Sequence, residues 1–248
     1  MNILVTGGGT VAPIDDVRRI TNASTGRFSA AISEAALRRG ARVWHLHAPG
    51  AIRPLDPPRL DYDADFAAEV DRMRARRAEW LDLRDRLRLV PLAAGTVAEY
   101  AEAVRSILSK VPIDVAFLAM AASDYAPDPA RGKLASDPDE LVLRCRRLPK
   151  VIRAVRDWAP GVYLVGFKLL SGSTEADLID RARLSGEANR ADLTVANDLG
   201  PLRAGRHTIH LVRPGHPVET IGPPSDLAAE LVDRVRGWAR GPRPGGLA

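Results

Sequence analysis

An uninterrupted apolar run at residues 115–120 limits the folds that this chain can adopt. The run reads Val-Ala-Phe-Leu-Ala-Met, with no polar residue to face solvent. Strands that are apolar on both faces are typical of parallel sheets covered by helices on each side. We therefore expect a central parallel strand here, ending at the polar segment 121–125.

The segments before this run alternate between strand and helix patterns. Residues 3–5 are apolar and lead into a glycine-rich loop. Apolar residues from Phe28 to Ala36 then recur with helical spacing, and Gly40 is placed to end that helix. Residues 43–46 predict a second strand. This order of strand, loop, helix and strand is typical of a parallel sheet.

The later segments continue the same pattern. Strands are predicted at 87–92, 141–143, 162–167 and 193–196, and helices at 97–108, 151–158, 174–189 and 227–238. Residues 208–211 and 218–221 predict a small antiparallel addition. The predicted fold class is α/β, with a Rossmann-like, doubly wound and mostly parallel sheet.

Residues 64–87 predict a heavily charged helix after a proline-rich linker at 49–60. Its apolar residues fall near one stripe: Phe66, Val70, Met73, Trp80 and Leu87. Arg77 and Arg84 interrupt the stripe, so we expect a solvated helix with a narrow buried seam. We expect residues 1–240 to form a single domain and 241–248 a flexible tail.

Composition excludes several classes of protein. The chain has 248 residues, of which 46% are hydrophobic and 27% charged, so a packed core is possible and wholesale disorder is not. The single cysteine, Cys145, excludes a disulfide framework and a multi-cysteine zinc site. No apolar run reaches the roughly 20 residues that span a bilayer, and no signal peptide is visible. We expect a cytoplasmic protein without membrane contact.

The charge balance favours an anionic partner, since the net charge is +5 and the pI about 9.8. Nucleic acid is not expected, because basic and acidic residues are interspersed and no aromatic–basic stacking pattern is present. Lysine occurs only at positions 110, 133, 150 and 168, and arginine is the common cation elsewhere. These lysines are notable because a guanidinium cannot replace a compact ammonium.

Four predicted strand ends carry polar or glycine-rich sequence: residues 6–10, 121–125, 167–168 and 197–198. Doubly wound sheets bind ligands at the carboxyl ends of their strands. We therefore expect the four segments to meet at one edge of the sheet. The five histidines show no spacing typical of metal ligands, and we predict no metal-ligating residues.

The glycine-rich loop at 7–10 could let the backbone approach a phosphate, or it could be an ordinary glycine turn. No Gly-Lys-Ser/Thr follows, so the loop is not a P-loop. The third glycine of the dinucleotide fingerprint is missing, and no acidic residue ends the second strand. These absences argue against an NAD(P)-dependent oxidoreductase.

Residues 22–26 precede a predicted helix. Ser24 or Thr25 could cap that helix, and the same hydroxyls could cradle an anion. Asp124 could cap a turn or accept hydrogen bonds from a substrate. Lys133 alone would be a solvated lysine, and Lys150 would be a helix-start cation that is favourable only beside an anion.

Taken together, these segments resemble the phosphopantothenate–cysteine ligase family. The matching segments are residues 5–10 with 13–18, 20–26, 121–125, 133–134, 148–152, 165–168 and 191–198. The resemblance is to the standalone bacterial form without a decarboxylase domain. It implies a helical insertion at about 56–86 and a mobile active-site loop that carries Lys133.

The resemblance implies a nucleotide-dependent ligase of coenzyme A biosynthesis. The family activates the carboxylate of 4′-phosphopantothenate with CTP to an acyl-cytidylate, and then forms an amide with L-cysteine. It further implies Mg²⁺ on the triphosphate and a homodimer. The residues implied as catalytic are Asn22 and Lys133, and those implied to bind substrate are Ser24, Thr25, Gly26, Ala121 and Asp124. Those implied to bind the nucleotide are Gly7, Gly8, Gly9, Thr10, Pro149, Lys150, Val151, Phe167 and Lys168.

The chain departs from the family pattern at four positions. Ser29 replaces a common glycine, Ser136 a basic residue, and Ser185 and Asn189 two phosphate-binding lysines. The alternatives are an ATP-using version of the ligase, a degenerate nucleotide-binding homologue and an NAD(P)-binding Rossmann protein.

Overall fold

The computed structural model describes residues 1–137, 139–203, 205 and 207–241. The predicted tail at 241–248 therefore lies outside the described residues, apart from Gly241. None of the described helices combines the length and the apolar character needed to cross a bilayer.

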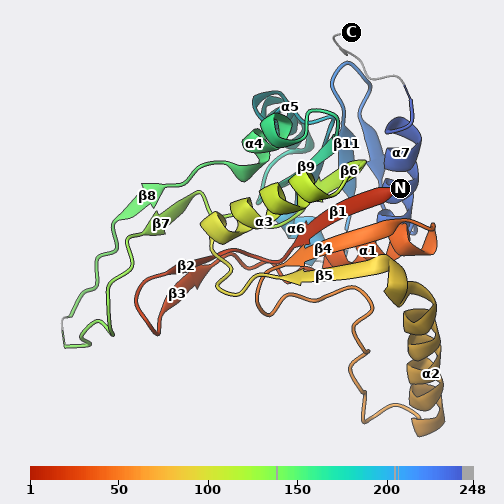
Figure 1. The fold of residues 1–248 in the computed structure, drawn as a ribbon, viewed down its shortest axis with the longest axis horizontal. Helices are drawn as coiled ribbons and strands as arrows, with labels where there is room; N and C mark the ends of the chain where they lie inside the picture. The colour runs from red at the N-terminus through yellow and green to blue at the C-terminus, as the bar shows by residue number, and fades with distance from the viewer. Residues whose placement is uncertain (138, 204, 206, 242–248) are drawn as a thin grey trace.

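An eight-stranded sheet forms the centre of the molecule, in the order β12-β11-β10-β9-β6-β1-β4-β5 (Figure 1). Its strands are β1 (Asn2–Gly7), β4 (Arg42–His47), β5 (Leu87–Pro91), β6 (Val115–Leu118), β9 (Tyr163–Leu170), β10 (Leu193–Asp198), β11 (Ile209–Val212) and β12 (Glu219–Ile221). All neighbouring pairs are parallel except β10–β11 and β11–β12. The predicted doubly wound sheet with an antiparallel addition is confirmed.

Helices cover both faces of this sheet. The described helices are α1 (Arg27–Arg38), α2 (Phe66–Leu83), α3 (Val97–Lys110), α4 (Val151–Trp158), α5 (Glu175–Asn189), α6 (Leu199–Arg203) and α7 (Leu227–Trp238), with a 3₁₀ turn, η1 (Arg84–Arg86). α1 and α7 pack on one face, whereas α3, α4 and α5 pack on the other. The predicted central strand is β6, in which Phe117 faces the α1 side and Leu118 the α3 side.

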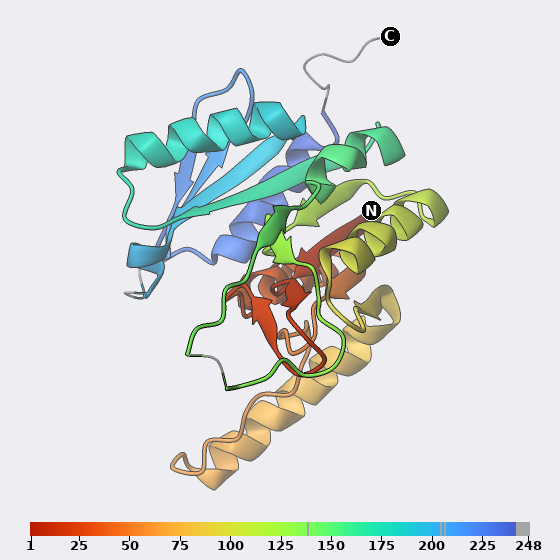
Figure 2. The ribbon, with the colours of Figure 1, turned by 90° about the vertical axis from the view of Figure 1, so that its left-hand side faces the viewer.

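Two small hairpins extend beyond the carboxyl edge of the sheet, which faces the viewer in Figure 2. One pairs β2 (Val11–Pro13) with β3 (Arg19–Thr21), and the other pairs β7 (Tyr125–Pro127) with β8 (Cys145–Arg147). The predicted strand at 141–143 is wrong. Its apolar side chains stay largely in solvent, and the polar segment that follows is the one that pairs with β7. An apolar pattern cannot reveal a strand whose two faces are exposed.

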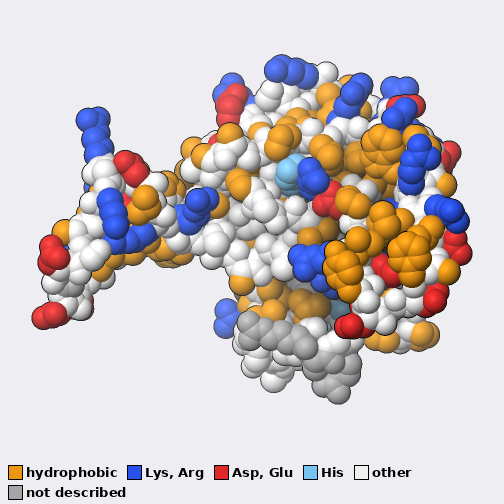
Figure 3. Space-filling view, turned by 90° about the horizontal axis from the view of Figure 1, so that it is seen from below, with side chains coloured by type: hydrophobic (Ala, Val, Ile, Leu, Met, Phe, Trp, Pro, Cys, Tyr) orange, Lys and Arg blue, Asp and Glu red, His pale blue; other side chains and the backbone are white. Residues whose placement is uncertain are grey.

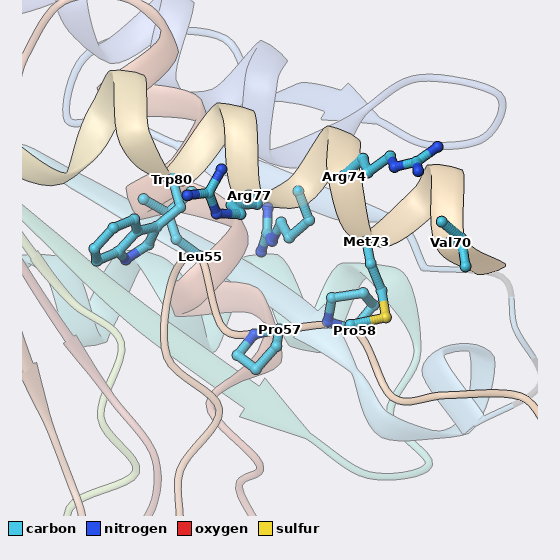
Figure 4. A pocket seen from close by; sticks show the side chains of 9 residues that line it. Leu55, Pro57, Pro58, Val70, Met73, Arg74, Arg77 and Trp80 are labelled. Carbon is cyan, nitrogen blue, oxygen red and sulfur yellow. The ribbon is translucent and has the colours of Figure 1, made fainter.

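The charged helix is confirmed as α2, but its buried seam is wrong. Leu83 is the one buried residue of α2, whereas Phe66 is 81% exposed and Trp80 is 41% exposed. Ion pairs hold the helix to α1 instead, since Arg76 Nη2 lies 2.5 Å from Glu34 Oε1. An open apolar groove of about 550 Å³ remains between α2 and the Pro57–Pro58 segment, and Met73 extends toward Pro58 (Figure 4). That residues 56–86 are an insertion, and that residues 1–240 are one domain, stay predictions.

Candidate active site

The four polar strand ends meet at one edge, as predicted, because β1, β6, β9 and β10 are neighbours in the sheet. The strand order reverses between β1 and β6, which is where doubly wound sheets open a ligand crevice. Gly9 and Ala121 form an isolated bridge across this point, and Thr10 N donates to Ala121 O at 3.1 Å. Ser123 N donates to Thr10 Oγ1 at 2.9 Å. The segments 6–10 and 121–125 are therefore joined at the switch point.

Each glycine of the loop at 7–10 is required by its own neighbours. A Cβ on Gly7 would lie 1.8 Å from Ser29 Oγ, and one on Gly9 would lie 2.5 Å from Asn22 O. Gly8 has a φ of 91°, in the left-handed region that favours glycine. Close packing and backbone conformation therefore account for the glycines of this tight turn. That the turn also binds phosphate stays a prediction.

The start of α1 lies beside this loop, since a Cβ on Gly26 would come within 3.3 Å of Gly8 N. The expected N-cap at Ser24 or Thr25 is wrong, although Thr25 Oγ1 accepts from Arg27 N at 3.4 Å: the N-cap is Gly26, with φ of 76°. Its left-handed backbone, which the sequence pattern does not encode, moves the helix start past both hydroxyls. Among the described residues no side chain accepts from Phe28 N or Ser29 N, so these two N–H groups of the first turn stay available to an anion at the loop.

Asn22 joins the base of the β2–β3 hairpin to the end of β6. Its side-chain Nδ2 donates to Ala121 O at 2.7 Å, although the residue is exposed overall. Two residues that the sequence analysis placed in one site are therefore in direct contact. The second N–H of the Asn22 amide stays available to a ligand.

Asp124 and Lys150 form an ion pair, with Lys150 Nζ 2.5 Å from Asp124 Oδ1. The two residues were predicted to bind different ligands, and their pairing was not predicted. Leu148 N donates to Asp124 O at 2.8 Å, which brings the start of α4, with Pro149 and Val151, to this position. The carboxylate supplies the anion that a lysine at a helix start requires.

Phe167 on β9 belongs to a small aromatic cluster at the same edge. Its ring meets Phe28 edge-on at 6.2 Å, and Phe28 meets His207 at 5.0 Å. Burial lowers the pKa of His207. Phe28 and His207 were not predicted as site residues, because nothing in their spacing links them to Phe167. The side chain of Lys168, the next residue, has no hydrogen bond or ion pair within the described part of the chain.

Lys133 is exposed, and within the ranges that the structure describes its side chain has no partner. Its loop runs along the β2–β3 hairpin (Figure 2), and both belong to the arm that projects from the body in Figure 3. Gly132 N donates to Asp16 Oδ2 at 3.1 Å, and Leu134 N donates to Asp15 Oδ2 at 3.0 Å. The structure therefore places Lys133 at the tip of the hairpin and Asn22 at its base, without a hydrogen bond between them.

Asp15 is the most shielded carboxylate of this region, and its side chain is fully buried. Burial acts to raise the pKa of Asp15, but hydrogen bonds from the N–H groups of Val17, Leu134 and Arg18 outweigh it. The charge of Arg18 acts in the same direction, and the net result is a lowered pKa. Asp15 therefore stays ionised at neutral pH.

The departures from the family pattern contact other residues of the chain. Asn189 Nδ2 donates to Ser185 Oγ at 3.2 Å on α5, and Arg18 Nη2 donates to Ser136 Oγ at 3.2 Å. The groove beside α2 contains none of the predicted site residues, so the candidate site is not placed there.

A doubly wound sheet with polar segments gathered at its switch point defines a Rossmann-like α/β protein. The family model described as the DNA/pantothenate metabolism flavoprotein C-terminal domain matches residues 1–83 and 81–237. The chain belongs to this family, and the resemblance to phosphopantothenate–cysteine ligases is confirmed at that level.

Relatives with curated names agree with this family. The chain is 31% identical over 210 residues to the coenzyme A biosynthesis bifunctional protein CoaBC of Thermococcus kodakarensis, covering 85% of this chain and 44% of that protein. It is 31% identical over 217 residues to phosphopantothenate–cysteine ligase 1 of Oryza sativa, covering 78% of this chain and 67% of that protein. The chain thus spans less than half of the Thermococcus protein.

Solved structures share the fold. The DNA/pantothenate metabolism flavoprotein from Streptococcus pneumoniae is 27% identical with a TM-score of 0.77, over 96% of this chain and 99% of that one. A Cab2 mutant in complex with phosphopantothenate-cysteine has a TM-score of 0.80 at 22% identity, over 96% of this chain and 86% of that one. At that identity the second likeness concerns the fold.

Proposed function

We propose that this chain is a phosphopantothenate–cysteine ligase that uses CTP. The observation that carries the proposal is the meeting of the family's motif segments at the switch point, where Asn22 Nδ2 donates to Ala121 O at 2.7 Å. The ligase names of the relatives support the same activity.

The reaction must first activate a carboxylate, because an amine cannot displace oxide from it. A carboxylate oxygen of 4′-phosphopantothenate attacks the α-phosphorus, and the bond to the pyrophosphate oxygen breaks. The cysteine nitrogen then attacks the acyl carbon, the bond to the nucleotide oxygen breaks, and the nitrogen loses a proton. The products are the amide, pyrophosphate and the nucleotide monophosphate.

The protein's part in this scheme is to position reactants and to offset charge. The loop 7–10 and the start of α1 would receive phosphate oxygens, with Ser24 and Thr25 adding hydroxyls. Asn22, held by Ala121, would donate to the acyl or phosphoryl oxygen. Lys133 would approach the α-phosphate on its loop, where its exposed ammonium has no competing partner among the described residues.

Asp124 and Lys150 would exchange partners when substrates bind. Lys150, with Lys168, would then neutralise phosphate charge in place of the lysines that Ser185 and Asn189 replace. Asp124 would accept hydrogen bonds from a substrate hydroxyl or amide group. Both groups are about half exposed, so water can replace either partner during the exchange.

The base would lie near Phe167 and Phe28, whose edge-to-face contact forms an apolar surface beside Lys168. The bacterial type of resemblance favours CTP over ATP. Mg²⁺ would accompany the triphosphate, since it is usually held by substrate phosphates and waters with few protein ligands. A cytoplasmic homodimer that acts without nucleic acid or a membrane completes the proposal.

Pyrophosphate release tests the proposal directly. The protein is incubated with CTP or ATP, with and without 4′-phosphopantothenate and L-cysteine. We expect release that requires phosphopantothenate and is faster with CTP. Faster release with ATP would support the ligase activity but would show that ATP, and not CTP, is the nucleotide. Binding of CTP without release in the presence of both substrates would indicate a degenerate homologue.

A further inference from the structure

One carboxylate joins the turn of the β2–β3 hairpin to the loop of Lys133. Asp15 Oδ1 accepts from Val17 N at 2.9 Å and from Arg18 N at 2.6 Å, both within its own turn. Its second oxygen, Oδ2, accepts from Leu134 N at 3.0 Å, across 119 positions of the sequence. The first set of bonds closes the turn, and the second oxygen, which also lies 3.4 Å from Arg18 Nη1, holds the loop.

The neighbouring Asp16 holds the same loop on the other side of Lys133. Gly132 N donates to Asp16 Oδ2 at 3.1 Å, and Asp16 N donates to Gly132 O at 3.1 Å. Ala130 N adds a bond to Ile14 O at 2.9 Å. The backbone on both sides of Lys133 is thereby fixed to one turn, while the lysine side chain itself stays exposed.

The hairpin that carries these bonds also carries Asn22 at its base. Thr21 pairs with Val11 in the ladder, and Asn22 Nδ2 bonds to Ala121 O at 2.7 Å. A short antiparallel ladder therefore lies between the asparagine and the loop of the lysine. Because bonds to a buried carboxylate are stronger than those between neutral groups, this link is a firm one.

We propose that the β2–β3 hairpin is the arm that carries Lys133, and that Asp15 is the positioning residue that fixes the loop to it. The inference rests on the proposed function, in which Lys133 acts at the α-phosphate. Asp15 does not touch the substrates. Its effect on the rate comes through the backbone N–H of Leu134, and not through its own charge at the reacting atoms.

Two variants remove this bond from opposite sides. Asp15→Asn can keep its oxygen toward the backbone N–H groups of Val17 and Arg18, but it then turns an NH₂ group toward Leu134 N–H and loses the ion pair with the Arg18 guanidinium. Leu134→Pro removes the donor and leaves the hairpin untouched. Ala135→Pro is the matched control, since Ala135 N makes no hydrogen bond within the described residues. Circular dichroism verifies that each variant is folded.

Two readouts separate positioning from a merely structural effect. Limited trypsin digestion, followed by mass spectrometry, measures cleavage after Arg131 in the loop. Steady-state pyrophosphate release gives kcat and KM separately. We expect Asp15→Asn and Leu134→Pro each to lower kcat by roughly 10- to 100-fold, with KM for cysteine unchanged. Cleavage after Arg131 should become faster in Asp15→Asn and stay at the wild-type rate in Ala135→Pro.

The double variant supplies the decisive comparison. Both changes remove the same hydrogen bond, from Leu134 N to Asp15 Oδ2. Asp15→Asn should therefore lower kcat little further in the Leu134→Pro background. Independent, multiplying losses, or wild-type kcat in both single variants, would overturn the inference while leaving the ligase activity standing. A wild-type protein that releases no pyrophosphate would instead remove the proposed function, and the catalytic part of the inference with it.

Discussion

Lys150 Nζ lies 2.5 Å from Asp124 Oδ1, and this ion pair connects the start of α4 with the segment after β6. The side chains are 41% and 49% exposed, so the pair contributes about 1 kcal/mol or less to the free energy of unfolding. A pair of this kind can be exchanged for a bound phosphate at little cost. Lys150 therefore lies at the site as a cation but contributes little to the stability of the fold.

Lys150→Gln should separate binding from stability. We expect the affinity for CTP to fall by about 10-fold or more, because a charge-assisted contact to phosphate is lost. The free energy of unfolding should change by less than about 1 kcal/mol. Titration calorimetry and urea denaturation measure the two quantities, with Lys110→Gln at the exposed end of α3 as control. Unchanged CTP affinity with a large loss of stability would contradict this assignment.

Lys133→Gln should abolish turnover without affecting the fold. The ammonium is exposed and has no partner in the part of the chain that the structure describes, so the melting temperature should not change. Loss of one electrostatic contact in the transition state typically lowers a rate by about 10² to 10³. Stopped-time pyrophosphate assays measure the effect. A rate close to that of the wild type would reject the role of Lys133.

Gly7→Ala should destabilise the protein, because its new Cβ would meet Ser29 Oγ at 1.8 Å. Overpacking of this kind costs about 1–3 kcal/mol. Ser29→Gly removes the obstacle, so the double variant should be more stable than Gly7→Ala alone, although it loses the hydrogen bond from Ser29 Oγ to Gly26 O. Urea denaturation of the three variants tests this. Simple addition of the two single effects would show that Ser29 does not set the requirement at Gly7.

His45 should make the protein less stable in mild acid. Burial, with a smaller contribution from His47, lowers the pKa of His45 from 6.5 to about 3. Between those values the unfolded chain binds a proton that the folded protein does not. The free energy of unfolding therefore decreases as the pH is lowered, by up to about 1.4 kcal/mol per pH unit. Denaturation at pH 7, 6 and 5 measures this slope. His45→Gln should flatten it, and an unchanged slope would exclude His45 as the cause.

The centre of the sheet could be predicted because its strands there are largely buried on both faces and end in polar segments. The apolar run at residues 115–120 predicted β6, and the carboxyl ends of β1, β6, β9 and β10 lie at one edge of the sheet as expected. The two hairpins at the edge could not be predicted, because β3 and β8 are exposed on both faces. Their pairing depends on the partner strand, and single-sequence periodicity does not report partners.

The contacts within the site also could not be predicted from the sequence. Asp124 and Lys150 each had an assigned ligand, yet nothing in the spacing indicates that they bind each other. Asp15 lay in a quoted motif without an assigned role, because its second oxygen acts on a residue 119 positions away. The buried seam of α2 failed for the opposite reason: a helical stripe was present, but among the described residues no helix or strand packs over it.

The central claim is that the substrate carboxylate is activated by bonding to the α-phosphorus of the nucleotide. Carboxyl-¹⁸O-labelled 4′-phosphopantothenate tests it most directly. In a single turnover with CTP and L-cysteine, mass spectrometry should find one ¹⁸O in the nucleotide monophosphate and none in pyrophosphate. Label in inorganic phosphate, with the nucleoside diphosphate as co-product, would show an acyl-phosphate route and contradict the account.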